Sequence, residues 1–129
     1  MSVQPVATSD ELAQLRRRYL VALDAAQAAG ERTIDTLVAA REARELARRH
    51  AEAGRPMIEL EDVIKPESLR TAVHDALADL ERTRHDAQRL LFQLLRGEGV
   101  TLADIARGYG ISRQLVSRLV NEPDPPRAR

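Results

Sequence analysis

The chain has 129 residues, of which 43% are apolar and 31% are charged, with only three aromatic side chains and a formal net charge of zero. The apolar residues are mostly Ala, Leu and Val, which favours an elongated all-α chain over a thick globular core. Because the net charge is zero, the molecule as a whole is not a basic protein that attracts nucleic acid over its entire surface. The lack of cysteine excludes disulfides and thiolate metal sites.

No apolar run approaches the roughly 18 residues of a membrane span. Residues 1–11 also lack the basic and apolar regions of a signal peptide. We therefore expect a cytoplasmic protein with no membrane partner.

The first predicted helix runs from about Ser9 to Ala53 and ends at Gly54 and Pro56. Thr8 and Glu11 have capping-box spacing, in which the hydroxyl accepts from a free amide and the carboxylate accepts from the amide of the cap residue. This places the start of the helix directly after Thr8.

The apolar residues of this helix recur at spacings of three and four, which predicts one packed stripe. The stripe consists of Leu12, Leu15, Tyr19, Leu23, Ala26, Gly30, Ile34 and Leu37. Gly30 either permits close helix approach or breaks the helix in two. We favour a continuous helix because Glu31 is a poor N-cap for a new one.

Residues 55–65 form an apolar connector, expected to be a packed loop or one short helical turn. A second helix is predicted from Pro66, a favoured first-turn residue, to Arg96. Its stripe alternates four and three residues through Val73, Leu77, Leu80, Arg84, Ala87, Leu91 and Leu94. Arg84 interrupts the stripe, and we expect it to extend to the edge rather than to fix the register of a coiled coil.

The segment Thr101–Asn121, TLADIARGYGISRQLVSRLVN, contains two short helical patterns in close succession. It follows Gly97-Glu98-Gly99, which is expected to act as a hinge, and Thr101 begins a second capping box. Gly108-Tyr109-Gly110 is expected to break the two helices, with glycine where a sharp corner needs positive φ. Two helices joined at a steep angle by such a short turn form a helix-turn-helix.

The segment resembles the helix-turn-helix of bacterial transcription regulators at five positions. A small residue faces the partner helix, a glycine occupies the turn four residues later, an aliphatic residue follows, and the second helix buries two more. The five residues are Ala106, Gly110, Ile111, Val116 and Leu119. The resemblance covers about a fifth of the chain and implies sequence-specific binding of double-stranded DNA.

The charge distribution supports this interpretation. Net charge is +1 for residues 1–55, −3 for 56–95 and +2 for 96–129. No acidic residue lies between Asp104 and Glu122, whereas that window contains Arg107, Arg113 and Arg118. Because phosphates repel carboxylates, an acid-free window favours a DNA-facing surface.

Seven side chains are candidate DNA ligands. Arg113 and Gln114 are expected to contact base edges in the major groove, since Arg pairs with guanine and Gln with adenine. Ser117 and Arg118 are expected to contact either bases or phosphates. The remaining candidates, expected at phosphates, are Thr101 and Ser112 at helix N-termini and Arg107.

The sequence contains no pattern of catalytic or metal-binding chemistry. It lacks a nucleophile elbow, a phosphate-binding glycine loop and a zinc-protease signature, so we expect no enzyme and no cofactor. The histidines, His50, His74 and His85, complete no ligand shell and are expected at the surface. The basic triplet 16–18 spreads around a helix and is expected to be solvated.

The sequence therefore predicts an elongated dimerisation or interaction region over 1–96, a DNA-binding region over 97–122 and a flexible tail over 123–129. A single helix-turn-helix offers few phosphate contacts, so a homodimer through the long helices is expected. A nucleoid-associated transcriptional regulator is the leading hypothesis. The alternative is a helical protein-interaction module, such as an antitoxin, polymerase accessory or scaffold subunit, whose C-terminal motif docks a protein.

Overall fold

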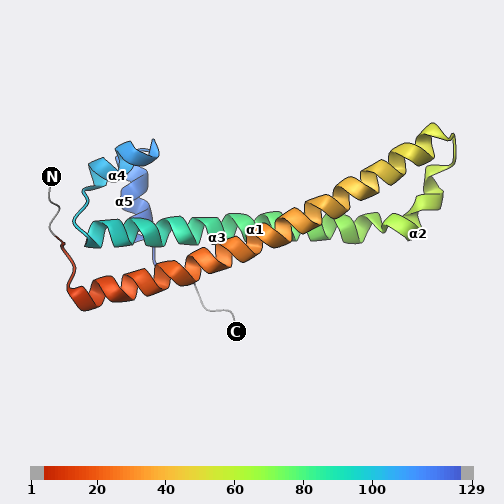
Figure 1. Ribbon diagram of the computed structural model, residues 1–129. Helices are drawn as coiled ribbons and strands as arrows, with labels where there is room; N and C mark the ends of the chain where they lie inside the picture. Colours follow the sequence, from red (N-terminus) through yellow and green to blue (C-terminus); the bar gives the residue numbers. More distant parts are fainter. Residues whose placement is uncertain (1–4, 126–129) are drawn as a thin grey trace. The chain divides into compact units, whose positions relative to one another are not determined.

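The protein is described by a computed structural model, in which residues 5–125 are described. Within them the chain is all-α and has no strand, as predicted. The long helices are α1 (Ser9–Glu52) and α3 (Pro66–Gly97). The short ones are the 3-10 helix η1 (Met57–Leu60), α2 (Glu61–Ile64), α4 (Leu102–Tyr109) and α5 (Arg113–Asn121) (Figure 1).

The start of α1 uses the predicted cap in a modified form. The Glu11 N–H donates to Thr8 Oγ1 at 3.1 Å, and the Thr8 hydroxyl donates to Glu11 Oε1 at 3.1 Å. The carboxylate thus accepts from the hydroxyl rather than from the expected amide. The pair still fixes the first turn, because a free amide of the helix end gains a partner.

Gly30 lies inside an unbroken α1, which confirms the continuous helix and excludes the break. A Cβ on Gly30 would lie 4.0 Å from Leu80 Cδ1, an ordinary contact. Glycine is therefore not required here for close helix approach.

The contacts divide the chain into two units. The first unit contains the chain up to Asp24 and from Arg84 onward, and the second unit is Ala25–Thr83. The ends of the long helices thus group with α4 and α5, whereas the sequence divides the chain near residue 97. The functional division into 1–96, 97–122 and 123–129 stays a prediction.

In the second unit, α1 packs on α3 through small side chains. Ala29, Thr33 and Ala40 are buried, and Thr33 Oγ1 lies 2.7 Å from the Ala29 carbonyl and 3.2 Å from the Ala76 carbonyl. The predicted stripe is wrong here, since Ile34 is 63% exposed and Leu37 is 43% exposed. Small residues are preferred because they let the helix backbones approach closely.

The predicted α3 stripe is confirmed at Ala87 and Leu94, which are buried. Leu77 of the stripe is 48% exposed, whereas Thr83 and Leu90, which lie outside the stripe, are buried. Arg84 is exposed, and its Nη1 donates to Gln88 Oε1 at 3.3 Å. As expected, Arg84 extends away from the seam.

The connector is helical, with η1 followed directly by α2, which agrees with the expected short turn. Leu60 is buried beneath it. His50 is also buried, with Nε2 3.0 Å from the Pro56 carbonyl, so its predicted surface position is wrong. The imidazole bridges the end of α1 and the connector, which keeps its buried nitrogen satisfied.

Asp79 joins the two helices of the second unit electrostatically. Its carboxylate accepts from Arg32 of α1 at 2.6 Å and from Arg82 within α3. These hydrogen bonds, first that of Arg32 and then that of Arg82, hold the pKa of Asp79 below its ordinary value of 3.8. The folded chain therefore favours the ionised carboxylate.

We expect Asp79 to stabilise the second unit at neutral pH and to lose this effect in acid. A depressed pKa contributes stability that is complete above the unfolded value of 3.8 and disappears as pH falls through the lower folded value. Thermal unfolding of the wild type and of Asp79→Asn should differ most above about pH 4, and the difference should shrink as the pH falls below 3.8. A difference independent of pH would contradict this role.

Candidate nucleic-acid interface

Helices α4 and α5 are each fixed by a hydroxyl N-cap, as the sequence predicts. Thr101 Oγ1 accepts from the Asp104 N–H at 3.1 Å, and Ser112 Oγ accepts from the Leu115 N–H at 3.1 Å. Each cap satisfies one amide in the first turn of its helix, and the amides that precede it remain without an intrahelical acceptor. Both helix N-termini therefore carry partial positive charge and free donors.

The turn between the two helices is shorter than predicted. Gly108 and Tyr109 belong to α4, so the expected break at Gly108-Tyr109-Gly110 is wrong in its extent. Gly110 alone adopts the left-handed conformation, with φ 66° and ψ 34°, and its N–H donates to the Ala106 carbonyl. A side chain at this φ would be strained, which explains the glycine.

Tyr109 extends α4 because its ring packs on α3. The Tyr109 and Phe92 ring centroids lie 4.9 Å apart at an interplanar angle of 69°, an edge-to-face arrangement. This contact compensates for the low helix propensity of Gly108. The two rings lie on different helices, so helical spacing could not predict that they pack together.

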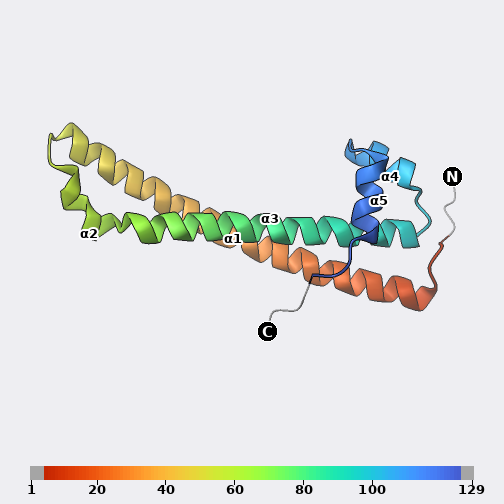
Figure 2. The ribbon, with the colours of Figure 1, turned by 180° about the vertical axis from the view of Figure 1, so that it is seen from behind.

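A single core holds α4 and α5 on the C-terminal end of α3, all within the first unit (Figures 1 and 2). Phe92 and Val116 are fully buried at its centre. The other buried members are Ile105, Ala106 and Leu119. Ile111 packs against them from the turn, so all predicted inward positions of the motif, including Ala106 next to α5, do face the core.

The end of α3 is tied down rather than free to hinge. The Gly97 carbonyl accepts from the Val6 and Ala7 amides at 2.9 and 3.0 Å. A Cβ on Gly97 would lie 3.2 Å from Leu12 Cδ2 and from Leu15 Cδ1, a close approach that favours glycine. The start of α1 therefore anchors the segment that leads into α4.

Most candidate DNA ligands lie at the surface. The exposed ones are Thr101, Arg107, Ser112, Arg113, Gln114 and Arg118. Ser117 is half-buried, and its carbonyl accepts from Asn121 Nδ2 at 2.9 Å. Arg107, which is expected at a phosphate, is bonded in this structure to the Asp104 carboxylate one turn earlier.

The acids at and beyond the C-terminal end of the acid-free window lie next to basic side chains of the same unit. Glu122 Oε2 lies 2.8 Å from His85 Nε2 and 4.0 Å from Arg89 Nε. Asp124 is bonded to Arg89 at 3.0 Å and also to Arg18. These pairs reduce the negative charge next to α5.

Arg89 is the feature that sequence reasoning missed. Its side chain is 3% exposed and also lies 3.6 Å from Asp86. It binds Asp124 within the stretch expected to be a flexible tail, of which residues 123–125 are described and 126–129 lie outside the described part. A buried arginine needs such partners, because an unpaired charge in the interior is costly.

Gln93 fixes the far end of α5 by a second contact from α3. Its Nε2 donates to the Val120 carbonyl at 3.2 Å, which gives a partner to a carbonyl in the last turn of α5. Together, Gln93 and Arg89 set the position of α5 on α3 at the end opposite to Ser112.

Comparison with known proteins gives no family assignment: no family model, curated protein or solved structure matches the chain. Over residues 5–125, no group of three or more His, Asp or Glu side chains is arranged to hold a metal ion. None of the described helices is both long enough and apolar enough to cross a bilayer.

Proposed function

We propose that α4 and α5 form a helix-turn-helix that binds double-stranded DNA, with α5 as the recognition helix in the major groove. The observation that carries the proposal is the division of α5 into two faces. Val116 and Leu119 enter the core, while Arg113, Gln114 and Arg118 stay exposed. This is the arrangement in which side chains near the start of a recognition helix reach base edges.

The local electrostatics support an anionic ligand. Helix α5 contains no acid, and its N-terminus carries free amides. The nearest acids along the chain, Asp104 and Glu122, already face Arg107, His85 or Arg89. A phosphate backbone approaching α5 thus meets exposed arginines with little opposing negative charge.

The proposed roles of the seven candidate residues follow from this geometry. Arg113 and Gln114 contact bases, and Arg118 with Ser117 contacts bases or phosphates. At Thr101 and Ser112 the hydroxyl lone pairs serve the caps, so the helix amides and the hydroxyl protons are the groups left for phosphates. Arg107 must exchange Asp104 for a phosphate oxygen.

We further propose that the protein acts as a homodimeric transcriptional regulator. Three arginines on one head give few phosphate contacts, and two linked heads bind one site with far higher avidity. A two-fold dimer reads half-sites about 34 Å apart or a multiple of that spacing. The predicted nucleoid location rests on the same proposal.

Titration of a random DNA duplex with the full chain tests the DNA-binding class. We expect micromolar or tighter binding at low salt, because counterion release drives non-specific association. The affinity should fall at least about ten-fold between roughly 50 and 200 mM salt. Fluorescence anisotropy of a labelled duplex measures both quantities.

The test variant is Arg107→Gln/Arg113→Gln/Arg118→Gln. Its matched control is Arg41→Gln/Arg48→Gln/Arg49→Gln on α1. Each variant removes three charges, but only the first should flatten the salt dependence. No binding by the wild type at micromolar protein in low salt would instead support the helical protein-interaction module.

A further inference from the structure

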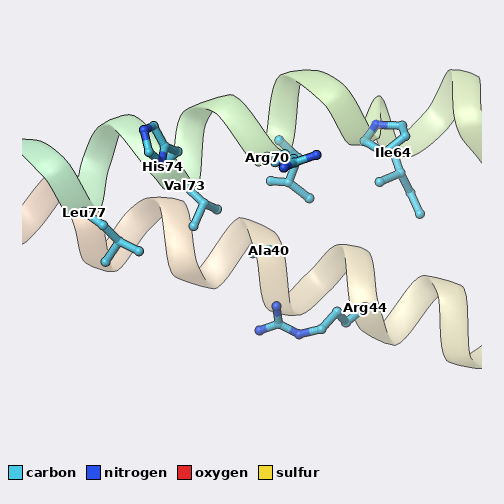
Figure 3. A pocket seen from close by; sticks show the side chains of 9 residues that line it. Ala40, Arg44, Ile64, Arg70, Val73, His74 and Leu77 are labelled. Carbon is cyan, nitrogen blue, oxygen red and sulfur yellow. The ribbon is translucent and has the colours of Figure 1, made fainter.

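The second unit contains an apolar groove between its two long helices (Figure 3). The groove has a volume of about 450 Å³ and is open to solvent along one side. Val73 and Leu77 point from α3 toward α1, where the small side chain of Ala40 leaves room. The rest of its apolar wall is formed by Ile64, Pro66 and Leu69.

A cluster of exposed apolar side chains lies next to the groove, on η1 and α2. Met57 is 47% exposed, Ile58 67% and Val63 66%. We call this cluster the tip. Ile64 and Pro66 line both the groove and a smaller hollow beneath Met57, so the groove and the tip form one continuous apolar surface. Such a surface marks an interaction site.

The two halves of this surface carry opposite charges. Arg44, Arg70 and His74 line the groove, and no acid does. Glu61 and Asp62 lie on α2 in the tip, and neither takes part in a side-chain ion pair within the described residues. The tip is therefore the chemical complement of the groove: apolar knobs with acids match an apolar hollow with arginines.

We propose that a second copy of this chain covers the surface, with the tip of each copy in the groove of the other. A two-fold interface must be self-complementary, because each contact of residue i with residue j is repeated as j with i. A groove and a complementary tip side by side on one unit meet that requirement. This proposal deepens the homodimer of the proposed function by assigning its surface.

The pairing buries Ile58 and Val63 against Val73 and Leu77, and it places Glu61 and Asp62 near the arginines of the groove. The apolar contact provides the stability, because it removes apolar side chains from water. The charges select the orientation of the two copies. If tip met tip and groove met groove, like charges would face each other. Ile34, on a part of α1 that does not line the groove, stays exposed.

Two charge-reversed variants test the proposal. The tip variant is Glu61→Arg/Asp62→Arg, and the groove variant is Arg44→Glu/Arg70→Glu. Each variant alone opposes like charges at both contacts, so its dimer should weaken at least about ten-fold. When the two variants are mixed, the basic tip of the tip variant meets the acidic groove of the groove variant at one contact. At the other contact, the native acidic tip of the groove variant meets the native basic groove of the tip variant.

Sedimentation velocity of the full chain without DNA provides the measurement. We expect a wild-type dimer, mostly monomer for each variant alone and a heterodimer in the equimolar mixture. The heterodimer also shows that both variants are folded. Ile34→Arg is the matched control, as an exposed apolar residue of the same unit outside the groove and tip, and it should leave the dimer intact.

Four outcomes would overturn the proposal: a monomeric wild type, variants that dimerise like the wild type, a mixture that stays monomeric, or dissociation by Ile34→Arg alone. A monomeric wild type that binds dodecanoate through Arg44 and Arg70 would assign the groove to a lipophilic anion instead. Dimerisation is measured without DNA, so its failure is distinct from failure of DNA binding by α4 and α5.

Discussion

Replacing Phe92 by alanine is expected to destabilise the first unit by about 3–5 kcal/mol. The Phe92 ring is fully buried and forms the α3 side of the core that holds α4 and α5. The substitution loses the free energy gained by burying the ring and leaves a cavity in its place. It also removes the edge-to-face contact with Tyr109. A loss of this size is a large part of the stability of a small domain.

Chemical denaturation followed by circular dichroism measures the effect. Ile34→Ala is the control, because a 63% exposed aliphatic residue should change stability by no more than about 0.5 kcal/mol. A loss below about 1 kcal/mol for Phe92→Ala would show that α4 and α5 do not depend on this core. Duplex binding should decline with the unfolded fraction of the first unit.

The N-terminal ends of the helices could be predicted from the sequence because local chemistry determines them. Thr101 and Ser112 are the N-caps of α4 and α5. Pro66 begins α3, because its fixed φ suits the first turn of a helix. The capping hydrogen bonds join residues only three apart. Such short-range interactions leave a clear pattern in sequence.

The packed face of α1 could not be predicted in the same way. The pattern of large apolar residues pointed to Ile34 and Leu37, but the helices meet through Ala29, Thr33 and Ala40. Hydrophobic spacing cannot distinguish a seam of small residues inside a hairpin from a large apolar stripe that faces elsewhere.

The candidate DNA interface was predicted where it depends on spacing and missed where it depends on distant contacts. The inward positions Ala106 and Val116 follow from helical periodicity. The contact of Arg89 with Asp124 joins residues 35 apart, and that of His85 with Glu122 joins residues 37 apart. An arginine within an apolar stretch of α3 was the available signal, because a buried guanidinium requires acidic partners.

These distant contacts also connect the core to the proposed DNA-binding face. Arg89 and Gln93 of α3 hold the chain at the end of α5, while the Ser112 cap and Val116 fix its start and middle. The exposed side chains of α5 are therefore presented from a helix that is fixed along its length. Rigid presentation reduces the conformational entropy lost when side chains bind bases.

The double substitution Arg113→Ala/Gln114→Ala is expected to remove most sequence discrimination while leaving the fold intact. Both side chains are exposed at the start of α5 and do not contribute to the buried core. Each lost base contact should cost about 1–3 kcal/mol of discrimination, or roughly 5- to 150-fold in relative affinity. Binding to random DNA should weaken less, because phosphate contacts of Arg118 and the helix amides remain.

Selection from a random duplex library first defines the preferred site of the wild type, and competition with a scrambled duplex then measures discrimination for each variant. The matched control is Gln14→Ala/Arg17→Ala, which removes the same two chemical groups from exposed positions of α1. It should retain wild-type discrimination, since only side chains that enter the major groove of the DNA distinguish bases. Wild-type discrimination by the α5 variant would show that α5 is not the recognition helix, even if duplex binding itself persists.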